Sequence, residues 1–489
     1  MVMNAAHPEN STPEPARKKR FSLGRLIDDF FVLASGQLFS KVFGFLAFAW
    51  LARQLTVEEY GAVETAVGMA AIGAIALEMG TGAIGVRRIS QSESGAMHVL
   101  GDVIAGRMFL AILAAPLLAI FYIAATRSSA PDALFWIFAV SLFAIPFNHN
   151  WFFQAHERMG VAGFGLTLKM GVFLVALLLL APQRNGVVYV AVSEVIAAVA
   201  MALWFCVFGY LMIRPDHPRY SVASSVKMLR ESAQLGASSF VNALAQFLPV
   251  LVVATAADDI ETAKFGASQR LVVSLMTFSY VYYFNLFPLI ARRMIDDASA
   301  LTRIISASVR VTAWVGVVTG VVFWVFAPLV MRLVFGAAFE PAGRVFGILV
   351  WSGVIILASG NARWLLVAGK RQSSLLAAHV VNATSVVGLG YLFSSMLGAM
   401  GAAVACVIGA CGLWAVAHHR TRGLDVRPDL SGNLIPAATA AAIVISLTLL
   451  KLQPAPAAGL AAVMLAAGML VDRRLPGALG ALIKAKSAA

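Results

Sequence analysis

Long apolar runs recur along this chain and constrain its fold more than any other feature. From residue 30 to residue 471, segments of 18 or more mostly apolar residues follow one another, separated by short polar stretches. Each run is long enough to cross a bilayer as a helix. Of the 489 residues, 60% are hydrophobic and 12% are charged, whereas a soluble chain carries about twice that charged fraction. The pattern predicts an all-α, polytopic membrane protein.

The distribution of Lys and Arg predicts how the spans are oriented. Fourteen spans are predicted, at residues 29–52, 62–85, 100–125, 133–153, 161–181, 187–212, 233–256, 265–290, 306–335, 343–366, 374–396, 398–417, 433–451 and 456–471. With the N-terminus inside, the inner segments hold 24 Lys and Arg and the outer segments hold 6. By the positive-inside rule, this asymmetry places both termini in the cytoplasm.

Charge pattern and missing motifs exclude several classes of function. The net charge of +13 does not indicate a nucleic-acid partner, because the basic residues lie in short segments between spans. Cys206, Cys406 and Cys411 fall inside apolar runs, which predicts neither disulfides nor a zinc site. The sequence has no P-loop, nucleophile elbow or H-E-x-x-H motif. We therefore expect a protein that is not an enzyme and that holds no metal or cofactor.

Two polar stretches about 205 residues apart are similar to each other. "LARQLTVEEYGA" (51–62) and "VATAADDIETAKFGA" (253–267) each contain acidic residues and end on an aromatic residue followed by Gly-Ala. Each is predicted to be a tight hairpin between antiparallel spans, with acidic side chains near the positive end of the next helix dipole. The paired positions favour a duplication of six spans, related by an axis along the membrane normal. Chance similarity of two loops is the alternative.

The duplication predicts two lobes joined by a long inner loop. The predicted segments are a basic cytoplasmic tail (1–24), an N-terminal lobe of six spans (25–212), an inter-lobe loop (213–231), a C-terminal lobe of six spans (232–418), two further spans with their preceding loop (419–472) and a cytoplasmic tail (473–489).

Three stretches resemble the Wzx-type polysaccharide flippases of the multidrug/oligosaccharidyl-lipid/polysaccharide exporter superfamily. They are "FSKVFGFLAFAWLARQLTVEEYGAVETA" (39–66), "EMGTGAIGVRRISQ" (78–91) and "PLVMRLVFGAAFEPAGRVFGIL" (328–349). The resemblance covers most of residues 25–420. It implies two six-helix lobes around a central cavity, alternating access, and a location in the bacterial inner membrane.

The resemblance also implies a substrate. This is an oligosaccharide repeat unit linked to a polyprenyl pyrophosphate of the undecaprenyl type, moved from the cytoplasmic to the periplasmic leaflet for exopolysaccharide or O-antigen synthesis. The polysaccharide polymerase machinery is a candidate partner. A lipid II-type flippase and a drug/cation antiporter are alternatives within the superfamily. A membrane glycosyltransferase or polymerase is an alternative of another class, which the short outer segments disfavour.

Ionisable residues inside the predicted spans are the candidate site residues. A charge at membrane depth costs at least about 2.5 kcal/mol and usually faces a cavity or a partner. A cationic cavity for phosphate would be lined by Lys41, Lys169, Arg270, Arg107 and Arg363. Candidates for binding a coupling ion are Glu194, Glu78 and Asp102. Arg offers a planar fork for phosphate oxygens and Lys a point charge.

The alternative for these residues is structural ion pairing. Lys41 with Glu64, or Lys169 with Glu194, would neutralise two charges inside the membrane without any substrate. The sequence gives no interhelical distances, so both interpretations stay open for Lys41, Lys169 and Arg270.

Overall fold

The computed structural model describes residues 23–91, 95–126, 128–180, 187–213, 220–424, 426, 428–450 and 453–487. Almost all of the predicted basic tail and most of the 213–219 part of the predicted inter-lobe loop lie outside these residues. Within them the chain is helical and contains no strand, which confirms the all-α prediction.

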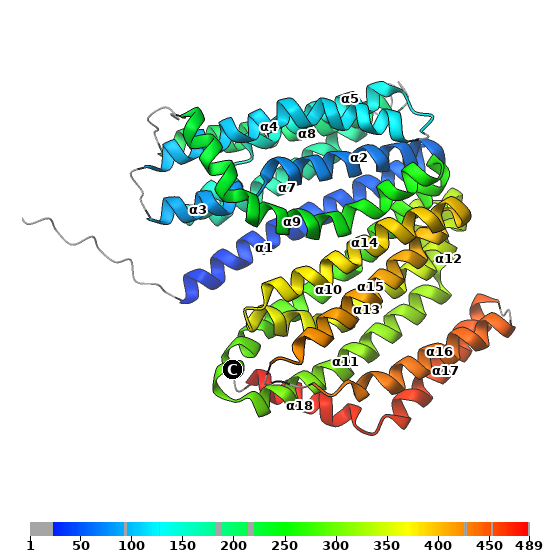
Figure 1. Ribbon diagram of the computed structural model, residues 1–489. Helices are drawn as coiled ribbons and strands as arrows, with labels where there is room; N and C mark the ends of the chain where they lie inside the picture. The colour runs from blue at the N-terminus through cyan, green and yellow to red at the C-terminus, as the bar shows by residue number, and fades with distance from the viewer. Residues whose placement is uncertain are drawn as a thin grey trace, which may run out of the picture.

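The helices form two groups and a C-terminal addition (Figure 1). The first group consists of α1 (Leu23–Gln54), α2 (Val57–Glu78), α3 (Thr81–Gln91), α4 (Ala96–Ala125), α5 (Asp132–Ser141), η2 (Leu142–Phe147), α6 (Asn150–Ala155), α7 (Met159–Leu180) and α8 (Val188–Ile213). The second consists of α9 (Val222–Ala256), α10 (Asp259–Asp296), α11 (Ala298–Val325), α12 (Ala327–Phe335), η4 (Ala337–Ala342), α13 (Gly343–Ala368), α14 (Gln372–Leu397) and α15 (Ala399–Thr421). The addition consists of η5 (Leu430–Asn433), α16 (Leu434–Leu450), α17 (Pro454–Val471) and α18 (Leu475–Ser487).

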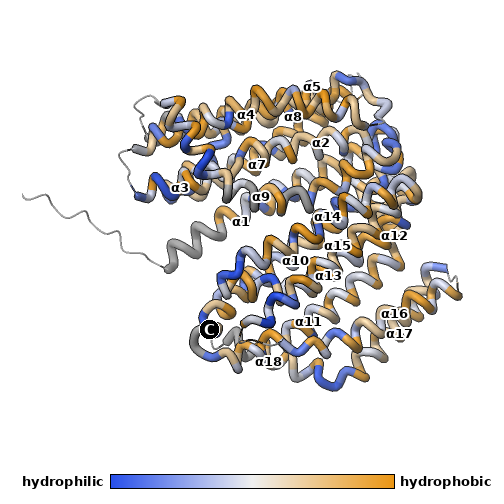
Figure 2. Tube along the Cα trace, viewed as in Figure 1, coloured by the Kyte–Doolittle hydropathy of each residue, from blue (hydrophilic) through white to orange (hydrophobic). Residues whose placement is uncertain are grey.

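Twelve helical segments of the described chain are long and apolar enough to cross a membrane. Most helices are apolar along their length and more polar at their ends (Figure 2). The predicted count of fourteen spans is not confirmed, because α1 and α9 are not among the twelve. In α9 the described stretch Gln246–Ala256 is apolar but shorter than a membrane span. Both helices run between the two groups in Figure 1, where protein replaces part of the lipid contact.

Helix α9, the first helix of the second group, contacts both lobes. At its start, the backbone N–H of Ser221 and the hydroxyls of Ser224 and Ser225 donate hydrogen bonds to Asp102 of α4. Near its other end, α9 packs on α14, where a Cβ at Gly390 would lie 3.3 Å from Val252. The predicted lobe boundary at residue 232 therefore falls inside a continuous helix.

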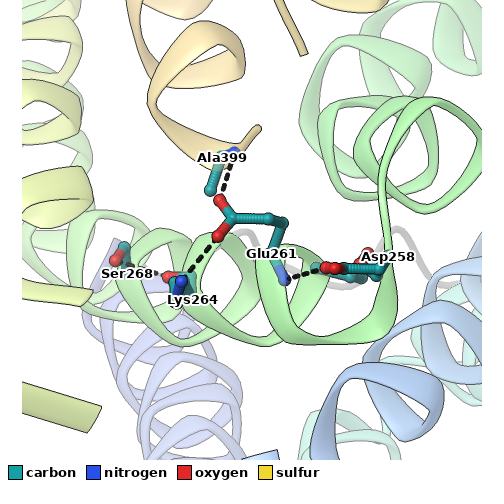
Figure 3. Close-up of polar contacts among 6 residues, drawn as sticks. Asp258, Glu261, Lys264, Ser268 and Ala399 are labelled. Carbon is teal, nitrogen blue, oxygen red and sulfur yellow. Dashed lines mark hydrogen bonds and ion pairs between the residues drawn. The ribbon is translucent and has the colours of Figure 1, made fainter. Parts of the chain in front are cut away.

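Both predicted hairpins are present, and their polar residues cap helices. Thr56 and Glu59 form a capping box at the start of α2, two residues after α1 ends. In the second hairpin the Asp258 carboxylate accepts the backbone N–H of Glu261 at 2.9 Å. Glu261 in turn accepts the N–H of Ala399 at 2.7 Å and pairs with Lys264, so that it caps α15 as well (Figure 3). These bonds satisfy helix-terminal N–H groups that have no partner within the helix.

The glycines of the two hairpins lie in one interface between α2 and α10. A Cβ at Gly61 would lie 1.8 Å from the carbonyl oxygen of Asp259. A Cβ at Gly266 would lie 2.7 Å from the side-chain Cγ of Glu64. Since real Cβ contacts are never this short, both helices need glycine here to approach so closely. The duplicated Gly-Ala motif thus positions the lobes against each other.

The C-terminal helices are anchored to α11 by a buried ion pair. Arg310 of α11 pairs with Asp472, which follows α17 and is 1% exposed. Trp314 Nε1 donates to the second carboxylate oxygen of Asp472 at 2.9 Å. Apolar side chains of α11, α16 and α17 pack together beside this pair. The addition therefore covers an outer face of the second lobe.

We expect that Gly61→Ala lowers the free energy of unfolding by about 1–3 kcal/mol, the usual cost of overpacking. The reason is that the added methyl group meets the backbone of α10. Gly388→Ala is the matched control, because this helical glycine has no atom within 4 Å of an added Cβ. Thermal unfolding in detergent checks both variants. Equal stability of the two would contradict the close α2–α10 contact.

Candidate functional site

The two lobes meet at the end of the molecule where α2 and α10 begin, called here the closed end (Figure 1). From there the ribbons of the two groups diverge toward the end that carries α3 and α18, called the diverging end. Helices α1 and α2 of the first lobe face α10 of the second. The seam carries three charged side chains that connect the lobes: Lys41, Glu64 and Arg270.

An ion pair between Glu64 of α2 and Arg270 of α10 joins the lobes. Arg270 Nε lies 2.5 Å from Glu64 Oε1, and Arg270 Nη2 lies 2.9 Å from Glu64 Oε2. Both carboxylate oxygens are therefore held by one edge of the guanidinium group. Glu64 is 4% exposed, whereas the Arg270 side chain is 25% exposed. Such a two-point contact fixes distance and orientation together.

Aromatic rings enclose this ion pair. The Cζ atom of Arg270 lies 3.2 Å from the centroid of the Phe48 ring, so that the guanidinium rests on the ring face. The ring face attracts the guanidinium cation and so stabilises it in an apolar setting. Tyr60, one turn before Glu64, is fully buried and meets Phe48 edge-on at 6.4 Å.

Lys41 lies on the same seam and has no ion pair among the described residues. Its Nζ atom donates to the Thr277 hydroxyl of α10 at 3.3 Å, and its side chain is exposed. The alternative pairing of Lys41 with Glu64 is not observed, because Glu64 pairs with Arg270. Lys41 is therefore a seam cation whose charge is not neutralised by a neighbouring carboxylate in the described chain.

Lys169 does have a carboxylate partner. Its Nζ atom lies 2.6 Å from Glu194 Oε1, which joins α7 to α8 inside the first lobe. The side chains are 21% and 14% exposed. This is the structural pairing given above as the alternative, and it engages a proposed phosphate ligand and a proposed ion-coupling carboxylate with each other.

Arg107 and Arg363 are bound to neutral groups. Arg107 is 1% exposed; its Nε donates to the Thr81 hydroxyl at 2.9 Å and its Nη1 to the Asn148 carbonyl at 3.2 Å. It thereby holds the elbow between α2 and α3. Arg363 is half-buried, and it donates to Ser359 and to the carbonyl of Ile356 within its own helix.

The carboxylates proposed for ion coupling lie on different helices and have different surroundings. Asp102 accepts the bonds that cap α9, Glu194 pairs with Lys169, and Glu78 is exposed at the end of α2. In the described ranges no group of three or more His, Cys, Asp or Glu side chains is arranged to hold a metal ion. Their role in ion coupling stays a prediction.

Further polar contacts hold the closed end. The carboxylate of Asp259 in α10 accepts bonds from Ser128 and Ser129 of the first lobe, at 2.9 Å from the Ser128 hydroxyl and from the Ser129 N–H. Arg53 at the end of α1 donates to the carbonyls of Leu333 and Val334, the last turn of α12. These contacts involve neutral partners, and the Arg53 bonds satisfy carbonyls at the end of α12.

The "VFGAAFEP" turn completes the closed end. Phe335 and Phe339 are buried and lie edge-on to Tyr60, at centroid distances of 6.5 and 5.1 Å. Gly336 between them has φ +102°, a conformation that side chains disfavour. The sequence stretch that carried the family resemblance thus packs against the first hairpin.

At the diverging end, α3 is tied to α9. Arg88 Nη2 donates to Glu231 Oε2 at 2.7 Å. This hydrogen bond lowers the pKa of the Glu231 carboxyl, which lies outside the membrane-spanning segments. With the Asp102 contacts to Ser221 and Ser224, the pair fixes the first half of α9 to the first lobe.

Sequence reasoning found the cations of the seam but missed the partner of Arg270. The duplicated motif contained a usable signal. Glu64 lies three residues after Gly61, and Arg270 lies four residues after Gly266. Residues three or four apart share a helix face, so two glycines in one helix contact place Glu64 and Arg270 on the facing surfaces of α2 and α10. Phe48 carried no such signal, because an aromatic residue in an apolar run is not distinctive.

The fold is that of multi-pass membrane transporters. The structure of the lipid II flippase MurJ in an inward closed conformation matches 91% of this chain and 99% of its own length, with a TM-score of 0.70 at 11% identity. An inward-facing multidrug resistance MATE family transporter of the MOP superfamily matches 78% of this chain and 94% of its own, with a TM-score of 0.66 at 16% identity. At these identities the likeness shows the fold.

The family is given by sequence. The model of the polysaccharide biosynthesis protein family matches residues 26–294, more than half of the chain, and the protein belongs to this family. A comparison with curated proteins gives no match. The family match agrees with the resemblance to polysaccharide flippases, and the fold is shared with the lipid II flippase and the MATE family transporter above.

The Lys169–Glu194 pair yields a prediction on stability. We expect Lys169→Gln to destabilise the protein, because Glu194 then stays inside the membrane without a counter-charge. The loss should stay below the roughly 3–5 kcal/mol of a fully buried pair, since both side chains are partly exposed. Adding Glu194→Gln should restore most of it. Thermal unfolding of the single and double variants measures this, and a double variant as unstable as the single one would refute the pairing.

Proposed function

We propose that the protein is a flippase for oligosaccharide repeat units linked to a polyprenyl pyrophosphate. It would move them from the cytoplasmic to the periplasmic leaflet of a bacterial inner membrane, for exopolysaccharide or O-antigen synthesis. Membership of the polysaccharide biosynthesis family supports the substrate class, and the fold shared with a lipid II flippase supports lipid-linked transport.

The observation that carries the proposal is the charge of the seam between α1, α2 and α10. Arg270 is balanced by Glu64, whereas Lys41 has no ion pair among the described residues. The seam therefore carries a net positive charge at membrane depth. A pyrophosphate headgroup supplies the missing negative charge, and its oxygens accept hydrogen bonds from Lys and Arg. The polyprenyl chain stays in the lipid.

The arrangement of the lobes supports alternating access. They are held together at the closed end and diverge at the other. With the orientation that the positive-inside rule predicts, the closed end is periplasmic, so the headgroup would enter the seam from the cytoplasmic side. Separation of α2 from α10 would then expose it to the periplasm. The energy source is mass action or an ion gradient.

A drug/cation antiporter is the rival with the same fold. A cationic substrate would need a carboxylate that is free to bind it. Glu64 on the seam is neutralised by Arg270, and Glu194 by Lys169. These pairings favour an anionic headgroup over a cationic drug.

The proposal predicts the behaviour of Lys41. In liposomes that contain a fluorescent undecaprenyl-pyrophosphate oligosaccharide, we expect Lys41→Gln to slow flipping at least about tenfold, the equivalent of ~1.4 kcal/mol. Arg332→Gln is the matched control, because its side chain is 61% exposed and lies outside the seam. Stopped-flow quenching of headgroup fluorescence measures the rate. Equal rates for both variants and the unmodified protein would remove Lys41 from the site.

A further inference from the structure

Arg270 cannot pair with Glu64 and bind a phosphate with the same edge of its guanidinium group at the same time. The Glu64–Arg270 ion pair lies between the lobes at the closed end, and it occupies the guanidinium edge that a phosphate would use. Arg270 Nε and Nη2 both donate to Glu64, one to each oxygen. A phosphate oxygen pair has nearly the same spacing as a carboxylate oxygen pair, and it binds the same edge.

We propose that Glu64 occupies the Arg270 fork as a resident anion, and that the substrate phosphate replaces it. Binding of the headgroup and release of the closed end are then one exchange. The inference rests on the proposed function for the nature of the headgroup. It assigns Glu64 a role in transport that is different from binding the substrate.

Lys41 provides the first contact for a headgroup that enters the seam from the diverging end. It lies seven residues before Phe48 on α1, and its partner Thr277 lies seven residues after Arg270 on α10. Since the helices run in opposite directions, Lys41 is displaced about 10 Å from Arg270, toward the diverging end. A headgroup that enters there meets Lys41, which has no ion pair among the described residues, before it reaches Arg270.

The burial of Glu64 couples the exchange to movement. Gly266 leaves the space in which the Glu64 side chain lies, and the carboxylate is almost inaccessible while α2 and α10 touch. Once phosphate takes the fork, Glu64 is a buried charge without a partner. That state is strongly unfavourable in a water-poor environment. Separation of the two helices relieves it, because water then reaches the carboxylate.

Other contacts at the closed end do not respond to phosphate in this way. Asp259 binds Ser128 and Ser129, and Arg53 binds backbone carbonyls. None of these bonds pairs a cation with an anion that phosphate replaces. The Asp259 and Arg53 contacts oppose opening of the closed end whether or not a headgroup is bound. The Glu64–Arg270 pair makes opening depend on the headgroup.

The experiment measures the width of the closed end by electron spin resonance. Spin labels are placed at Glu58→Cys in the first lobe and Leu397→Cys in the second, both exposed. The background carries Cys206→Ala, Cys406→Ala and Cys411→Ala, and the full chain is held in lipid nanodiscs. Undecaprenyl pyrophosphate is the probe, and undecaprenol, which lacks the phosphates, is its control.

In the spin-labelled protein with Glu64 and Arg270 unchanged, undecaprenyl pyrophosphate should increase the population with the longer distance between labels. Undecaprenol should not. Glu64→Gln should raise the ratio of long to short distances at least about tenfold without any probe, because a neutral amide holds the fork less tightly. Asp259→Asn is the matched control. It also neutralises a carboxylate at the closed end, and we expect it to keep its response to the probe.

The single variant Arg270→Gln would leave Glu64 without its partner and could misfold. The double variant Glu64→Gln/Arg270→Gln is therefore used in its place. This variant should lose the response to the probe. The exchange is overturned by the following result. The Glu64→Gln variant and the protein with Glu64 unchanged show the same distances between labels, with and without undecaprenyl pyrophosphate, while the unmodified protein still flips its substrate. Absence of flipping in the unmodified protein overturns the proposed function instead, so the two failures are distinguishable.

Discussion

A charge inside a bilayer has no water to bind, and the arrangement of helices in this protein follows from that constraint. Ion pairs between different segments of the chain meet it: Glu64 with Arg270 between the lobes, Lys169 with Glu194 inside the first lobe, and Arg310 with Asp472 at the C-terminal addition. The first and third pairs connect segments 206 and 162 residues apart, whereas α7 and α8 are consecutive helices. The pairs therefore set which helices are neighbours as well as neutralising charge.

Close helix contact is what makes the interlobe pair possible. Small residues allow backbones to approach within a membrane, where lipid offers no hydrophobic drive for association. Gly61 brings the start of α2 against the backbone of α10, and Gly266 leaves room for the Glu64 side chain. A larger residue at either position would push the carboxylate away from the guanidinium. Packing and electrostatics at the closed end thus depend on the same two glycines.

Local features were predictable from the sequence, and long-range partners were not. The apolar runs predicted helices, and the acidic hairpins predicted capped turns, because both depend on neighbouring residues. The partner of Arg270 depends on the crossing of α2 and α10, which no local pattern specifies. The count of fourteen spans was not confirmed, because twelve helical segments of the described residues are long and apolar enough to cross a membrane.

Helix α9 shows how one element limits the movement of both lobes. Its start is fixed to α4 through Asp102 and to α3 through Glu231, while its other end packs on α14. Rigid rotation of one lobe against the other must therefore bend α9 or slide it along a neighbour. Pro249 lies in the second half of the helix, where a missing backbone N–H weakens the hydrogen-bond ladder. Bending there would let α2 and α10 part at the closed end without disturbing the contacts that hold the start of α9.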